Sequence, residues 1–157
     1  DPSLTVVLAT LNEVSNLPVV IDSVLQLHIP AVEIVVVDDG STDGTRDYLL
    51  RTAERDPRVV PILNSQRQTL TPAQCQGITR ATGDFVVVMD SDLQHPPRAV
   101  KDIYVELVRG ADLVIGSRYL PAAGTGERSP YRGMLSRGAE LIARSLLRNA
   151  RGVSDPL

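Results

Sequence analysis

Short apolar runs alternate along the chain with longer stretches in which apolar residues recur at helical spacing. The runs cover residues 4–9, 34–37, 59–63, 85–89 and 113–115, and helical patterns lie near 14–27, 43–55, 71–82 and 97–109. Continuous apolar strands that alternate with helices are typical of a parallel sheet covered on both faces. At 157 residues the chain is long enough for one domain with a core of its own. The pattern predicts an α/β domain with a mostly parallel central sheet.

Polar residues follow three of these runs at the point where each run ends. Thr10-Leu11-Asn12-Glu13 follows the first, Asp38-Asp39 the second, and Asp90-Ser91-Asp92 the fourth. Open α/β sheets bind ligands at the carboxyl ends of their strands. Residues i and i+2 of an extended chain point to the same side, so Asp90 and Asp92 are expected to face one site. Two close carboxylates repel unless a positive charge lies between them, which indicates a divalent cation carrying phosphate oxygens.

The other polar residues at these ends have a structural and a functional interpretation. We expect Asp39 to contact a ligand, because a double acid after an apolar strand is costly without a partner. Glu13 is the better ligand candidate of its segment, whereas Asn12 is suited to cap the following helix. Asp43 is expected to cap a helix as well. His95, before two prolines, is expected to shape a turn rather than to bind metal.

Charge is distributed unevenly along the chain, whose net charge is −3. Residues 1–127 carry 10 basic and 17 acidic side chains, and residues 128–157 carry 6 arginines against 2 acids. An amphipathic helix is predicted over 129–151, with arginines on one stripe and apolar residues on the other. The arginine stripe is either a solvated face over a core-packed helix or a basic face that lies on an anionic membrane surface. No nucleic-acid partner is expected.

Cysteine content and hydropathy suggest the compartment. The single Cys75 cannot form an internal disulfide and is compatible with a reducing environment. No signal peptide is visible, and no apolar run approaches the roughly 18 residues that a membrane span requires. We therefore expect a cytoplasmic location or one on the cytoplasmic face of a membrane.

Several families place acids at strand ends. Haloacid-dehalogenase-type phosphatases and receiver domains also need a lysine near the site, whereas the sole lysine here, Lys101, falls in a predicted helix. Dinucleotide-binding domains need a glycine-rich turn after the first strand, and Thr10-Leu11-Asn12-Glu13 contains no glycine. These departures argue against all three families.

The combined motifs resemble the family-two glycosyltransferases of GT-A fold, and among them the polyprenyl- and dolichyl-phosphate mannose synthases. The resemblance spans essentially the whole chain. It is carried by the segments 10–13, 35–45, Gly77 with Gly83-Asp84, 89–97 and Gly116-Ser117-Arg118-Tyr119. The segment Asp-x-Asp-Leu-Gln-His-Pro-Pro and the segment Gly-Ser-Arg-Tyr are specific to the lipid-phosphate branch.

The resemblance implies a role for each matching residue. Asp92, Arg118 and Arg132 would be catalytic, and Asp90, Asp92 and Gln94 would bind Mg²⁺ or Mn²⁺. Arg118, Arg132 and Ser136 would meet the acceptor phosphate. The nucleotide-sugar would be held by Ala9, Leu11, Glu13, Val37, Asp39, Asp90, Ser91, Asp92 and Arg118. In the segment 64–72, Arg67 stands in for the lysine usual in that loop.

The implied reaction is a metal-dependent, inverting transfer of a hexose from a nucleotide-diphosphate sugar to a polyprenyl or dolichyl phosphate. Mannose and GDP-mannose are the first choice. Two alternatives stay open: a transferase that uses a UDP-sugar and a glycan hydroxyl, and a non-catalytic nucleotide-sugar-binding module. Residues 1–157 would form one GT-A catalytic domain, cut short at its carboxyl end and working at a membrane surface.

Overall fold

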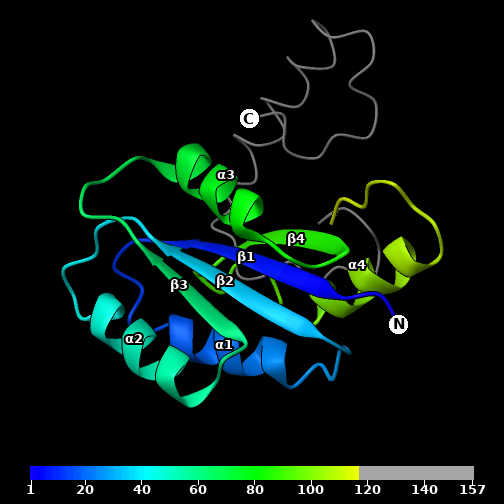
Figure 1. Cartoon of the computed structure of the whole chain (residues 1–157), viewed down its shortest axis with the longest axis horizontal. Helices are drawn as coiled ribbons and strands as arrows, with labels where there is room; N and C mark the ends of the chain where they lie inside the picture. The colour runs from blue at the N-terminus through cyan, green and yellow to red at the C-terminus, as the bar shows by residue number, and fades with distance from the viewer. Residues whose placement is uncertain (117–157) are drawn as a thin grey trace, which may run out of the picture. The chain divides into compact units, whose positions relative to one another are not determined.

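The computed structural model describes residues 1–116, of which 1–114 form one compact unit. The elements alternate strictly between strand and helix. In chain order they are β1 (Leu4–Thr10), α1 (Leu17–Leu25), β2 (Val32–Asp38), α2 (Thr45–Arg55), β3 (Val59–Leu63), α3 (Leu70–Arg80), β4 (Phe85–Asp90) and α4 (Ala99–Val108). The four strands pair in parallel in the order β3-β2-β1-β4 (Figure 1). This is the α/β architecture that the sequence predicts.

Helices cover both faces of the sheet. The α1, α2 and α4 face holds the main cluster of buried side chains, in which Leu4, Val6 and Leu8 of β1 are fully buried. Alternate side chains of β1 and β2 point to the opposite face, where Val7, Val35 and Val37 pack against Ala73 of α3. Figure 1 shows α3 on one side of the sheet and α1 and α2 on the other. The two central strands are apolar throughout because both of their faces are buried.

Strand β4 lies at the edge of the described sheet and is covered differently. Val87 and Met89 are buried in the main cluster, but Val86 and Val88, on the α3 side, are 37% and 40% exposed. Helix α3 packs mainly over β1 and β2 and contacts β4 less. Within residues 1–116, β1 and β2 are therefore covered on both faces, as expected, and β4 is covered fully on one face only.

The strand predicted over 113–115 does not form. Leu113 and Ile115 are 76% and 72% exposed, and no residue of that run pairs with the sheet among the residues described. A run of three residues makes too few ladder bonds to hold itself in place without a neighbouring strand. The helix predicted over 129–151 lies outside the described residues. Within residues 1–116, no helix combines the length and apolar character that crossing a membrane requires.

Hydrogen bonds close the amino edge of the sheet. One Asp84 carboxylate oxygen accepts bonds from the backbone nitrogen and the hydroxyl of Ser3, at 2.8 and 2.7 Å. Next to it, Thr5 donates to Glu33 at 2.7 Å and accepts from the backbone nitrogen of Gly83 at 2.9 Å. These contacts hold the turn between α3 and β4 against the start of β1.

Replacing Gly83 by alanine is expected to lower the free energy of unfolding. A Cβ there would lie 2.6 Å from the backbone nitrogen of Thr5 and 2.8 Å from the backbone carbon of Leu4. Backbone inside a paired strand cannot move aside, so the expected loss is about 2 kcal/mol, as for an overpacked core. Urea unfolding measures it. Arg51→Ala, on the exposed side of α2, is the control and should change stability by less than about 0.5 kcal/mol; equal stability of both variants would contradict this packing.

Candidate active site

The carboxyl ends of β1, β2 and β4 meet at one edge of the sheet. In the strand register Ala9 pairs with Val37 on one side and with Asp90 on the other. These three residues therefore form one row across the sheet, and neighbouring strands lie about 4.8 Å apart. Their side chains point to the face that α3 partly covers. Three of the residues predicted to bind the nucleotide-sugar are thus brought together by strand pairing alone.

The segment after β4 turns sharply and gathers three possible metal ligands. Ligand atoms of Asp90, Asp92 and His95 all lie within 4.8 Å of one another. The Nδ1 atom of His95 is 3.5 Å from Oδ2 of Asp90, and both side chains are nearly half exposed, at 48% and 43%. Since imidazole and carboxylate groups both bind divalent metals, this group of side chains fits such an ion. The structure therefore adds His95 to the two acids as a possible metal ligand, and its role in the turn stays a prediction.

Two hydrogen bonds fix the backbone of this segment. The Asp92 carboxylate accepts a bond from the backbone nitrogen of Gln94 at 2.9 Å, the geometry of an Asx-turn. Ser91 is 4% exposed and donates its hydroxyl proton to the carbonyl oxygen of Ala9 at 3.2 Å. Ser91 therefore ties the segment back to β1 and orients the acids on either side of it. The side chain of Gln94 is exposed next to Asp92, so its predicted metal role stays a prediction.

The loops after β1 and β2 are joined by polar side chains. The Asn12 side-chain oxygen accepts from Thr42 N at 2.8 Å, and its own backbone nitrogen donates to the Ser41 hydroxyl at 2.8 Å. Asp43 accepts from Val14 N at 3.1 Å and from Thr45 N at 3.0 Å. Asn12 therefore does not cap α1, as the sequence suggested, because its side chain reaches across to the neighbouring loop. Asp43 lies one residue before Gly44, the N-cap residue of α2, and accepts from one backbone N–H of the first turn, that of Thr45, so it meets the predicted capping role only in part.

Asp39 is buried and bonded to the loop between β3 and α3. Its Oδ1 accepts from Gln68 N at 2.8 Å and from the Asn64 amide at 3.3 Å, and its Oδ2 accepts from Thr69 N at 2.9 Å. Burial alone would raise the pKa of this carboxyl, but these hydrogen bonds and the charge of Arg67 together lower it below its ordinary value. The sequence correctly indicated that this acid needs a partner. Here the partners belong to the protein itself: two backbone N–H groups and the Asn64 side-chain amide.

Asn64 is a site residue that sequence reasoning missed. It is 8% exposed, and its amide donates both to Asp39 and to Gln76 of α3, the latter at 3.1 Å. A buried asparagine directly after an apolar strand was the available signal, because a buried amide is normally hydrogen-bonded.

Among residues 1–116, two further polar atoms at this edge are buried without a hydrogen-bond partner. They are the hydroxyl oxygen of Thr10 and Oδ1 of Asp38, which face each other as paired residues of β1 and β2. Asp38 is fully buried, and its other oxygen accepts from Ser41 N at 3.3 Å. Atoms of this kind commonly bond to a buried water molecule.

The remaining predicted residues divide into those beside this edge and those outside the described residues. Leu11 and Glu13 lie in the loop after β1, half-buried, and the Glu13 carboxylate accepts from the Asn16 amide at 2.7 Å. Arg118, Arg132 and Ser136 fall outside the described residues. Their predicted contacts with an acceptor phosphate stay predictions.

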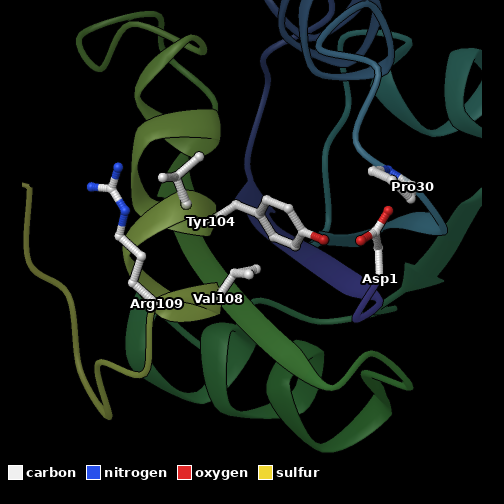
Figure 2. A pocket seen from close by; sticks show the side chains of 6 residues that line it. Asp1, Pro30, Tyr104, Val108 and Arg109 are labelled. Carbon is white, nitrogen blue, oxygen red and sulfur yellow. The ribbon is translucent and has the colours of Figure 1, made fainter.

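A hollow lies at the opposite, amino edge of the sheet. It measures ≈ 330 Å³ and is lined by Asp1, Pro30, Tyr104, Val105, Val108 and Arg109. In Figure 2 the Tyr104 ring points toward Asp1 and Pro30. The Tyr104 hydroxyl already donates to the carbonyl oxygen of Pro2 at 2.8 Å. None of the predicted site residues lines this hollow, so it carries no part of the candidate active site.

Comparison with known proteins agrees with this geometry. Glycosyl transferase family 2 matches residues 5–156. A dolichol-phosphate mannosyltransferase of Pyrococcus furiosus is 36% identical over 158 residues, which cover 98% of this chain and 44% of that protein. The Saccharomyces cerevisiae protein of the same name is 35% identical over 115 residues, or 73% of this chain and 43% of its own. The chain thus spans less than half the length of these relatives.

Solved structures give the same fold. The mannosyltransferase PcManGT of Pyrobaculum calidifontis, solved with GDP-Man and Mn²⁺, has a TM-score of 0.61 and 31% identity over 73% of this chain and 34% of its own. TarS of S. aureus, solved with UDP-GlcNAc, has a TM-score of 0.59 over 68% of this chain and 31% of its own, and at 22% identity it shows the fold alone. The fold is that of the GT-A glycosyltransferases. The chain belongs to glycosyl transferase family 2.

Acidification is expected to weaken the fold through Asp39. Because its pKa in the folded protein is below the 3.8 of the free side chain, its contribution is complete above that value and is lost as the pH falls through the folded pKa. The stability difference between the unmodified chain and Asp39→Asn should be constant above about pH 5 and should narrow below about pH 4. Urea unfolding at pH values from above about 5 to below about 4 measures this difference. A stability difference between the unmodified chain and Asp39→Asn that stays constant over this pH range, as expected for the control Arg51→Ala, would contradict a lowered pKa of Asp39.

Proposed function

We propose that the chain carries the donor site of a transferase that moves mannose from GDP-mannose to a polyprenyl or dolichyl phosphate. The observation that supports it best is the pair Asp90 and Asp92, held open at the carboxyl edge beside Ala9 and Val37. The relatives named dolichol-phosphate mannosyltransferase and the neighbour solved with GDP-Man support the choice of sugar, nucleotide and acceptor.

Different residues would contact different parts of the donor. The base and ribose would lie along Ala9, Leu11, Glu13, Val37 and Asp39, and the diphosphate would lie toward Asp90, Ser91 and Asp92. Asp90, Asp92 and Gln94 would hold Mg²⁺ or Mn²⁺, with His95 adjacent to them. The ion, when bound, would neutralise charge on the leaving diphosphate. The protein would contribute orientation, because Ser91 and the Asx-turn at Asp92 fix where the carboxylates point.

The acceptor determines how much acid–base chemistry is needed. A phosphate monoester is largely ionised at neutral pH, so its oxygen attacks without a strong general base. Transfer to a glycan hydroxyl would require a base near that hydroxyl. Arginine suits a phosphate acceptor because its planar fork matches the phosphate oxygens. Arg118 and Arg132, with Ser136, are the residues we assign to this role, and in-line attack would invert the anomeric carbon.

The location follows from the same proposal. A polyprenyl phosphate is anchored in a bilayer, so catalysis would take place at a membrane surface, and the arginines of segment 129–151 would face anionic lipid. The cytoplasmic face is the proposed side. Binding of the isolated chain to vesicles with and without anionic lipid would separate this role from that of a solvated helix face.

Donor binding is expected to depend on metal and on Asp92. GDP-mannose with Mn²⁺ should raise the melting temperature of the chain, and omission of the metal should abolish the shift, because the diphosphate then meets two bare carboxylates. Asp92→Ala should weaken metal-dependent GDP-mannose binding at least ~10-fold by calorimetry. The matched control, Asp84→Asn, changes a carboxylate at the far edge and should leave affinity unchanged. Unchanged affinity in Asp92→Ala would contradict the assignment.

The same screen separates the alternatives. UDP-glucose and UDP-GlcNAc should give smaller shifts than GDP-mannose. A larger shift with a UDP-sugar would favour a glycan-modifying transferase. No shift with any of the three donors would favour a non-catalytic module.

The resemblance implies that Arg118 contacts both the nucleotide-sugar and the acceptor phosphate, and we expect its contact with the acceptor to matter more for the reaction. Arg118→Ala should keep donor affinity within about 2-fold and lose about 100-fold in mannose transfer, the usual effect of removing one group that stabilises transferring charge. Transfer to a short-chain polyprenyl phosphate measures the rate, and calorimetry measures the affinity. If Arg118→Ala lost as much donor affinity as Asp92→Ala, the assignment of Arg118 to the acceptor would be wrong.

A further inference from the structure

We infer that Asn64 is a positioning residue, which holds the Asp39 carboxylate in place for the nucleoside end of the donor. The inference rests on the proposed function, in which Asp39 contacts the base or ribose. Asn64 would act through Asp39, by fixing the direction in which that carboxylate offers its oxygen atoms.

Asn64 is tied to the sheet edge by its own backbone. It follows the last residue of β3 and is 8% exposed. Its backbone nitrogen donates to the carbonyl oxygen of Asp38 at 2.9 Å, and its carbonyl oxygen accepts from the guanidinium of Arg46 at 3.3 Å. Asp38 directly precedes Asp39, so Asn64 contacts both the backbone and the side chain of this strand end.

The side-chain amide of Asn64 has a single favourable orientation. Its nitrogen carries two hydrogens, and two acceptors face it: Oδ1 of Asp39 at 3.3 Å and Oε1 of Gln76 at 3.1 Å. A flipped amide would turn its own oxygen toward the carboxylate and leave buried acceptors without donors, which is costly. The amide therefore always presents N–H groups to Asp39.

Gln76 gives this amide a rigid second anchor. It lies on α3 next to Gly77, where the helix comes so close to the sheet that a Cβ would collide with Val7 and lie 3.2 Å from Cγ2 of Val37. A helix seated this closely cannot slide without losing its packing on β1 and β2. The Gln76 oxygen is thus fixed relative to the strands that carry the donor site.

Asn64 differs from the other groups that bond to Asp39. The remaining donors, the backbone N–H groups of Gln68 and Thr69, belong to exposed residues of the loop before α3. Rotation of a carboxylate about its terminal bond is only weakly restricted by intrinsic preference, so hydrogen bonds decide its direction. Three of its roughly four acceptor positions are filled, which leaves one for an O–H or N–H donor of the nucleoside.

The test compares Asn64→Ala and Gln76→Ala with the matched control Gln74→Ala, which removes the same kind of side chain from the same helix. Calorimetry with Mn²⁺ measures affinities for GDP and for inorganic diphosphate. Diphosphate lacks the base and ribose, so it reports on the metal end of the site alone. Asp39→Asn and its double variant with Asn64→Ala complete a double-mutant cycle.

We expect Asn64→Ala to weaken GDP binding about 10-fold, because Asp39 loses its one buried donor, and Gln76→Ala to weaken it about 3-fold. Diphosphate affinity should stay within about 2-fold in both variants. The double variant with Asp39→Asn should lose less GDP affinity than the product of the two single losses, since Asn64 acts through that carboxylate. Gln74→Ala should leave both affinities unchanged.

Each contrary outcome has a distinct meaning. Unchanged GDP affinity in Asn64→Ala, equal losses for GDP and diphosphate, or fully multiplicative losses in the double variant would overturn the positioning role and leave the proposed function intact. Absence of GDP binding by the unmodified chain would overturn both. If Asn64→Ala fails to fold, Gln76→Ala, which keeps the asparagine, decides the question through the same comparison of GDP with diphosphate.

Discussion

Parallel pairing of β1 with β2 and β4 is the constraint on which the candidate site depends. The register sets Ala9 between Val37 and Asp90, and a shift of one residue would turn every one of these side chains to the other face. The apolar residues that precede them fix that register, because each central strand is buried on both faces. The same side chains that build the core therefore determine where the carboxylates emerge.

The acids at this edge fall into two kinds. Asp39 accepts hydrogen bonds from the loop 64–69, and Asp43 accepts them from the hydroxyl and backbone of Thr45 and from the backbone of Val14. Both carboxyls have a lowered pKa because these hydrogen bonds outweigh the effect of burial. Asp90 and Asp92 are more open, and a histidine lies near them. The first kind also joins the loops around the site, and the second is more open to a ligand. Carboxylates from similar motifs thus serve different purposes.

The family match and the geometry of the sheet edge support the same donor site. The match to glycosyl transferase family 2 covers almost the entire chain, and the row of residues across β2, β1 and β4 gives that match a physical basis. The chain spans 44% of the Pyrococcus furiosus relative, so the complete transfer reaction is a proposal that the fold alone does not establish. The donor half of that proposal rests on described side chains, and the acceptor half rests on Arg118, Arg132 and Ser136.

The sequence alone determined the alternating elements, the parallel sheet and the edge at which the acids meet, because periodicity and strand ends are local properties. It did not determine which acids are free. Tertiary structure decided that Asp39 bonds to residues 64–69, that Asn12 reaches the neighbouring loop, and that residues 113–115 form no strand. Each of these depends on partners more than about ten residues away or on the presence of a neighbouring strand. No pattern within a single segment records such partners, so only the folded chain reveals them.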